Sequence, residues 1–153
     1  MLSAGATAPE FTLADLAGGQ HSLHSLLERG PVLLALYKIS CPVCQMSMPY
    51  LQRLAIGTIP IVGISQDDDR ATRRFTQTLG LTMVTLLDRE EDGYPVSNAF
   101  GITHVPSLFL VEPGGMISLA VTGFDKRGME AIGKRANVVP FLSQDNVPEW
   151  KAG

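Results

Sequence analysis

The feature that most constrains this chain is a pair of cysteines placed where an apolar run ends and a helical pattern begins. The run, residues 32–37, is almost continuously apolar, as expected for a strand buried on both faces of a sheet. Cys41 and Cys44 follow it, and apolar residues then return at roughly helical spacing as far as Ala55. The sequence therefore predicts a buried strand, a short connection and a helix whose first turn carries both thiols.

The spacing of these cysteines indicates redox chemistry. Cys41 is expected where unpaired N–H groups and the helix dipole stabilise a thiolate, with Cys44 one turn inside and within reach of a disulfide. Pro42 suits the opening turn because its missing N–H has no helical partner to lose there. Pro49 falls inside the same helix, where we expect it to introduce a kink.

Two other uses of the cysteine pair have to be weighed. A zinc site needs two further ligands at suitable spacing, but there is no third cysteine, and His21, His24 and His104 form no such pair. Inert buried thiols would explain the apolar surroundings but not the spacing. We therefore expect no metal and no cofactor, and redox chemistry is the main hypothesis.

Length and composition describe one globular domain, residues 1–153. The chain can bury a substantial core, and 45% hydrophobic against 18% charged residues excludes a disordered protein. Net charge is −3 with no Lys/Arg cluster, so nucleic acid is not an expected partner. No apolar run is long enough to cross a bilayer, and the first residues do not resemble a secretory signal. We expect a cytoplasmic location, or an exported one if a signal has been removed.

The rest of the chain alternates strand-like and helical patterns. Apolar runs typical of strands lie at residues 59–65, 83–87, 107–111 and 116–121. Helical patterns lie at residues 67–79, 96–100 and 125–135. The first is opened by acidic residues and stopped by Gly80, and the last is capped by Asp125. An N-terminal hairpin is expected from residues 8–13 and 21–23, whereas residues 138–153 show no period and are expected to form an irregular tail. This order predicts an α/β sandwich with a mixed sheet.

Taken together, these motifs resemble the thioredoxin superfamily, and within it the TlpA/ResA-like thiol–disulfide oxidoreductases (redoxins) that border the peroxiredoxins of the AhpC/TSA type. The matching segments are Ala8–Leu13, Cys41–Cys44, Pro49, Val105–Val111 and Glu112–Gly115. Residues 59–100 also have the length of the extra strand–helix insertion of that branch. The resemblance implies a thioredoxin-like fold, with a central mixed β-sheet flanked by helices, an N-terminal hairpin and an inserted strand–helix unit.

The resemblance also implies roles for individual residues. Cys41 would attack a client disulfide, and Cys44 would resolve the resulting mixed disulfide. Pro106, in a cis peptide bond, would face the disulfide, and Val105 would offer its backbone to a substrate peptide. The implied partners are client proteins or small thiols and disulfides, together with an upstream reductant or oxidant. We expect the protein to act as a monomer.

Some positions depart from the family pattern. Ser40 stands where thioredoxins carry a Trp, and Ala35 stands where thioredoxin has a buried acid, so the group that takes the proton of the second thiol is not identified. Pro42 and Val43, which are expected to contact the substrate, differ from thioredoxin's dipeptide. His104 is expected in a solvent-facing loop, with a position beside the first thiol as the alternative.

Two further functions remain as alternatives. A peroxiredoxin-like thiol peroxidase needs the pattern Pro-x-x-x-Thr/Ser-x-x-Cys. With Cys44 as its cysteine the proline position is Tyr37, and with Cys41 the hydroxyl position is Lys38, so both alignments fail. A non-catalytic module that presents the proline face to a partner is disfavoured by the intact cysteines. The sequence therefore predicts a thiol–disulfide oxidoreductase.

Overall fold

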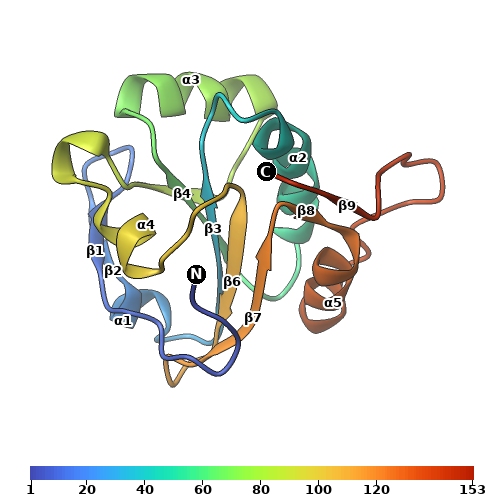
Figure 1. The fold of residues 1–153 in the computed structure, drawn as a ribbon, viewed down its shortest axis with the longest axis horizontal. Coiled ribbons are helices and arrows are strands. Elements are labelled where there is room, and N and C mark those ends of the chain that lie inside the picture. Colours follow the sequence, from blue (N-terminus) through green and yellow to red (C-terminus); the bar gives the residue numbers. More distant parts are fainter.

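The computed structural model describes residues 1–153 and has a mixed five-stranded sheet at its centre (Figure 1). The strands are β3 (Val32–Tyr37), β4 (Ile61–Ser65), β5 (Val84–Leu87), β6 (Ser107–Val111) and β7 (Ile117–Thr122). Their spatial order is β5-β4-β3-β6-β7; β3, β4 and β5 run parallel, and β6 is antiparallel to both β3 and β7. The expected α/β fold with a central mixed sheet is confirmed.

Strand β3 separates two hydrophobic cores, because successive side chains of a strand point to opposite faces. Leu33, Ala35 and Tyr37 belong to one cluster, and the residues between them belong to the other. The first face is covered by helices α2 (Pro42–Leu54), α3 (Asp69–Leu79) and α5 (Lys126–Ala136). The second is covered by α1 (Leu23–Leu26) and α4 (Pro95–Ala99). Every side chain of β3 is at most 1% exposed, so the strand is a rigid support for the segment that follows Tyr37.

The expected helix ends are present. The side chain of Asp68 accepts the Ala71 N–H at 2.8 Å to begin α3, and Gly80 ends it in the left-handed conformation. Asp125 accepts the Gly128 N–H at 2.9 Å and begins α5. Helix α2 includes Pro49 and continues to Leu54 as one helix.

The N-terminal residues form the expected hairpin. Its strands, β1 (Thr12–Ala14) and β2 (Gln20–Ser22), pair antiparallel as a separate two-stranded sheet. Ser22 then begins α1, since its hydroxyl accepts the Ser25 N–H at 3.0 Å. A short 3-10 helix, η1 (Glu90–Asp92), lies between β5 and α4. No helix of the structure combines the length and the apolar character that a membrane crossing requires.

The C-terminal tail is more ordered than its sequence predicts. Strand β9 (Trp150–Lys151) pairs antiparallel with β8 (Phe124–Asp125), so the prediction of an irregular tail is wrong for these residues. Asp145 forms an ion pair with Arg53 of α2 at 2.6 Å, which fixes the middle of the tail. Two-residue strands show no periodic pattern, because their pairing depends on a partner far away in the sequence.

Candidate active site

The two cysteines lie at the start of α2, directly after the buried strand β3. Cys41 is the residue that caps the helix, with extended backbone angles, and Pro42 follows as a first-turn residue. The Cys41 sulfur accepts the backbone N–H of Cys44 at 3.3 Å, and the Cys41 N–H donates to the Lys38 carbonyl at 3.2 Å. The first thiol therefore lies at the positive end of the helix dipole, as expected from the sequence.

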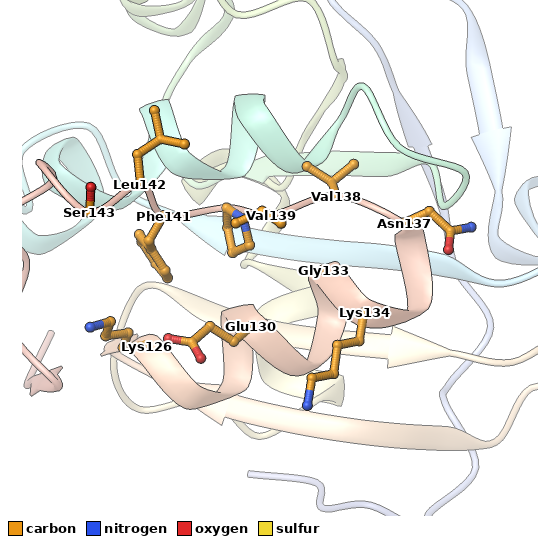
Figure 2. Close-up of a pocket in the computed structure, with 11 residues that line it drawn as sticks. Lys126, Glu130, Gly133, Lys134, Asn137, Val138, Val139, Phe141, Leu142 and Ser143 are labelled. Atoms are coloured by element: carbon orange, nitrogen blue, oxygen red, sulfur yellow. The ribbon is translucent and has the colours of Figure 1, made fainter.

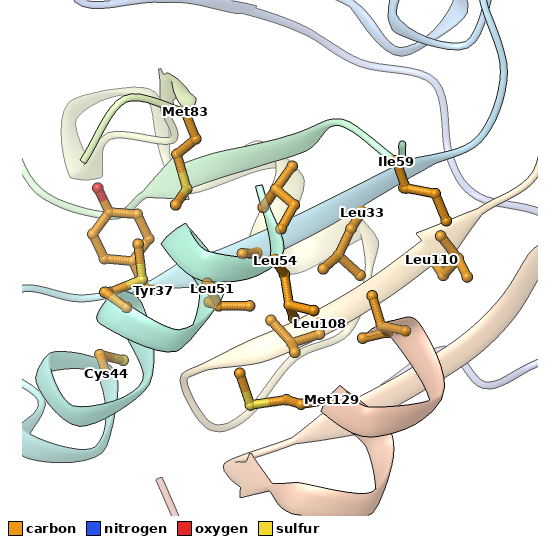
Figure 3. Packing of buried hydrophobic residues seen from close by; sticks show 14 of the residues in the cluster. Leu33, Tyr37, Cys44, Leu51, Leu54, Ile59, Met83, Leu108, Leu110 and Met129 are labelled. Carbon is orange, nitrogen blue, oxygen red and sulfur yellow. The ribbon is translucent and has the colours of Figure 1, made fainter. Parts of the chain in front are cut away.

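The two thiols differ in their exposure. Both cysteines are free, but Cys41 is half-buried whereas Cys44 is completely buried. Cys44 lies in the core cluster on the α2 face of the sheet, together with Tyr37 and Leu51 (Figure 3). Only Cys41 can therefore meet an incoming disulfide, and Cys44 is placed to react inward with Cys41.

The surroundings of Cys44 favour the protonated thiol. Burial is the main cause that raises its pKa, and a backbone hydrogen bond from Lys38 opposes the rise. The neighbouring Cys41 and the negative charge of Asp67 raise the pKa further. Ala35 is fully buried in the same cluster and offers no group to accept a proton. The thiol of Cys44 is thus buried and has no neighbouring side chain at Ala35 to take its proton.

Val105 and Pro106 lie next to the cysteines, as the resemblance implies. The peptide bond between them is cis. The Cys41 thiol donates to the Val105 carbonyl oxygen at 3.4 Å, which joins the helix start to the loop before β6. The Pro106 carbonyl accepts the Gly123 N–H at 2.8 Å, so the loop is also fixed to the segment after β7. The Val105 backbone is therefore held in contact with the Cys41 sulfur.

The other candidate residues, Pro42, Val43 and His104, differ in their exposure. Pro42 is exposed at the helix start, whereas Val43 is only 6% exposed and packs into the core cluster. His104 is exposed, as expected, and its ring Nδ1 lies 2.9 Å from the Thr103 hydroxyl. The roles of these residues stay predictions.

A small pocket opens beside Cys41. It has a volume of about 310 Å³ and is lined by Cys41, Gln66, Ile102, Thr103, His104, Val105 and Gly153. A larger pocket of about 540 Å³ lies between α5 and residues 137–143 and contains neither cysteine (Figure 2). The pocket that matters for the dithiol is therefore the smaller one.

Asp67 is a residue of the site that the sequence did not reveal. Its carboxylate accepts the Ile39 N–H at 2.8 Å, while the Gln45 side chain donates to the Ile39 carbonyl at 2.8 Å. Both backbone groups of Ile39, two residues before Cys41, are thus held by side chains from other elements. Asp67 is the first of three adjacent aspartates, a pattern typical of a helix start, but only Asp68 caps the helix.

Comparison with known proteins agrees with this geometry. The model of the AhpC/TSA family matches residues 4–120, which is most of the chain. The chain belongs to the AhpC/TSA family. Its sequence is 29% identical to the thiol-disulfide oxidoreductase ResA of Geobacillus thermodenitrificans over 127 residues, 80% of this chain and 71% of the relative. It is 30% identical to ResA of Halalkalibacterium halodurans over 125 residues, 78% of this chain and 69% of the relative.

The fold of this AhpC/TSA member also has close structural neighbours. The thioredoxin domain of a thiol-disulfide oxidoreductase from Bacteroides vulgatus superimposes with a TM-score of 0.78 at 23% identity, covering 90% of this chain and all of the neighbour. The predictions of a thioredoxin-like fold and of a thiol–disulfide oxidoreductase are confirmed. Nothing in the structure favours the cytoplasmic location over export, and the location stays a prediction.

Proposed function

We propose that the protein exchanges electrons with disulfide-bonded client proteins through Cys41 and Cys44. The observation that carries this proposal is the unequal exposure of two free thiols on one helical turn: one half-buried and one completely buried. A nucleophile that must meet a large partner needs exposure, whereas a resolving thiol needs only its neighbour. The Val105 backbone beside Cys41 supports a client peptide in this proposal.

The reaction balances in two steps. In the first, the Cys41 thiolate attacks one sulfur of the client disulfide; the client S–S bond breaks, and its other sulfur leaves as a thiolate and takes a proton. In the second, Cys44 loses its proton and attacks the Cys41 sulfur, which forms the Cys41–Cys44 disulfide and releases the second client thiolate. Two electrons and two protons pass to the client, and an upstream reductant restores the dithiol. Oxidation of a client is the same sequence in reverse, with an upstream oxidant.

Trapping of mixed disulfides tests this mechanism. In a Cys44→Ser variant the first step remains and the second is lost, so disulfide adducts with clients should accumulate at Cys41. The matched Cys41→Ser variant should trap nothing, since the remaining thiol is buried. Equal yields of adducts from both variants, or none from either, would contradict the proposal. Hydrogen peroxide separates it from the thiol peroxidase alternative, because rapid peroxide consumption by the wild type would favour that alternative.

A further inference from the structure

The end of the tail runs along the segment that follows β7 and reaches the active site. Strand β9 pairs with β8, and the Lys126 N–H donates to the Glu149 carbonyl at 3.0 Å, which continues the same ladder. The Trp150 indole N–H donates to the Thr122 carbonyl at 3.2 Å. The tail passes so close to the segment after β7 that any side chain at Gly123 would collide with the Lys151 carbonyl oxygen.

The last residues of the tail lie on the backbone of Val105. A β-carbon at Gly153 would collide with the Val105 carbonyl oxygen and carbon, and it would come close to the Pro106 nitrogen. The same Val105 oxygen accepts the hydrogen bond of the Cys41 thiol. Gly153 also lines the pocket of about 310 Å³ that opens beside Cys41. The tail is therefore a wall of the active site and covers part of its backbone.

We propose that residues 150–153 determine which disulfides reach Cys41. With these residues in place, the pocket beside the thiol admits a small disulfide, whereas an extended polypeptide that pairs with Val105 has to displace them first. This inference rests on the proposed function. Its physical basis is spacing: a paired backbone lies about 4.8 Å from its neighbour, and no second chain fits where Gly153 already touches the Val105 carbonyl.

The tail is held weakly enough to be displaced without unfolding the domain. Its strand is two residues long, and residues 149–153 are all exposed. The ion pair between Lys126 and Glu149 is long, at 3.5 Å, and exposed pairs of this kind contribute little to stability. Segments with few buried contacts open locally at small free-energy cost. A polypeptide client should therefore react more slowly than a small disulfide by the cost of this opening.

Two substitutions in the chain of residues 1–153 displace the tail in different ways. Gly153→Val adds a side chain where a β-carbon would collide with Val105. Lys151→Pro removes a backbone N–H from β9 and so weakens its pairing with β8. Ala152→Val is the matched control, because it adds bulk to the neighbouring exposed residue of the same tail. Gly153→Val carries the test if Lys151→Pro folds poorly.

The experiment compares single-turnover rates of the reduced proteins with two substrates, insulin as a polypeptide disulfide and hydroxyethyl disulfide as a small one. We expect Gly153→Val and Lys151→Pro to raise the ratio of the insulin rate to the small-disulfide rate at least threefold, and Ala152→Val to leave the ratio unchanged. Equal ratios in Gly153→Val and Ala152→Val would overturn the inference.

A failure of the proposed function gives a different result, because the wild type would then react with neither disulfide. In that case labelling of reduced Cys41 with a maleimide attached to a polypeptide decides the inference. Faster labelling of Gly153→Val than of Ala152→Val would support the placement of the tail over the thiol, and equal labelling would refute it.

Discussion

The starts of helices α2 and α4 are built alike, but α2 holds the Cys41 thiol very differently from the way α4 holds the Asp88 carboxylate. Each helix has a proline in its first turn, and at each start a side chain accepts at least one backbone N–H of the helix. At α4 the fully buried Asp88 carboxylate accepts the N–H groups of Val96 and Ser97 at 2.9 and 2.8 Å, and the Ser97 hydroxyl at 2.6 Å. At α2 the half-buried Cys41 sulfur accepts one N–H, from Cys44, at 3.3 Å.

This difference separates a structural hydrogen-bond acceptor from a sulfur that stays accessible. The acceptor at α4 is saturated by short hydrogen bonds and shielded from water, so its role is to join β5 to the helix. The Cys41 sulfur at α2 keeps its orientation through two longer hydrogen bonds, from the Cys44 N–H at 3.3 Å and to the Val105 carbonyl at 3.4 Å, and is only half-buried. A group that must form a covalent bond with a partner needs this looser support. The same helix-terminal physics thus serves folding at one site and chemistry at the other.

The largest expected effect comes from Cys41→Ser. We expect disulfide exchange to fall by roughly 10³-fold or more, because no other exposed thiol can replace the nucleophile. Serine is also a good capping residue, so the free energy of unfolding should change by less than about 1 kcal/mol. Chemical denaturation with parallel insulin-reduction assays measures both quantities. A variant that lost most of its stability would show that Cys41 is a structural cap like Asp88.

The opposite result is expected for Asp88→Ala. Removing the carboxylate leaves buried N–H groups of α4 without an acceptor, and we expect a loss of about 3 kcal/mol in the free energy of unfolding. Under conditions where the variant is folded, the alkylation rate of Cys41 should equal that of the wild type. Asp88→Asn, which keeps one acceptor oxygen, should lose less stability. A large change in Cys41 reactivity would contradict the claim that Asp88 serves stability alone.

The two cysteines should react very differently with alkylating reagents. Because burial raises the pKa of Cys44, iodoacetamide should modify native Cys41 more than about 100-fold faster than Cys44 at pH 7 to 9. The raised pKa of Cys44 also makes stability depend on pH. Above the unfolded pKa of about 8.5, Cys44 ionises in the unfolded chain while the native thiol stays protonated. The free energy of unfolding should therefore fall as pH rises above about 8.5.

Cys44→Ala is the control for this pH dependence. The variant should show a shallower loss of stability between pH 8.5 and 10 than the reduced wild type, since its native state lacks the buried thiol. The upper limit keeps the contribution of Tyr37 small, because burial raises its native pKa to about 12 and its effect on stability begins only as the unfolded tyrosine ionises near pH 10. Identical slopes for the two proteins, or rapid native alkylation of Cys44, would mean that the second thiol is not shielded.

The smallest effect is expected at Asp67. Asp67→Asn keeps an acceptor for the Ile39 N–H but removes a negative charge that helps to raise the pKa of Cys44. We expect the intramolecular step, measured as decay of a preformed mixed disulfide at Cys41, to become about two- to threefold faster at pH 7. Asp67→Ala also removes the hydrogen bond and should cost about 1 kcal/mol of stability. Equal decay rates in the wild type and Asp67→Asn would exclude an electrostatic role.

Local sequence patterns predicted most of the fold. The apolar runs at residues 32–37 and 107–111 predicted β3 and β6 with their observed ends, because strands buried on both faces are nearly continuous in apolar residues. The caps at Asp125 and Gly80 were also predictable, since these residues act on their own neighbours. Cys41, Cys44 and Val105 could be placed at one site through the family resemblance.

Most of the features that escaped prediction depend on long-range contacts. Asp67 is 28 residues from Ile39, and nothing in a row of three aspartates tells which of them caps the helix and which holds the active-site loop. The strand pairing of Trp150 with Asp125 is equally invisible in a tail without a period. The burial of Val43 was missed for a related reason, because a residue between two cysteines faces the substrate or the core according to the rotation of the helix.

The most direct test of dithiol exchange is equilibration of the reduced protein with glutathione buffers, followed by acid quenching and mass spectrometry. We expect one cooperative two-electron transition to an intramolecular Cys41–Cys44 disulfide, absent in both Cys→Ser variants. The formation of only glutathione adducts at Cys41, without an intramolecular disulfide in any buffer, would contradict the mechanism.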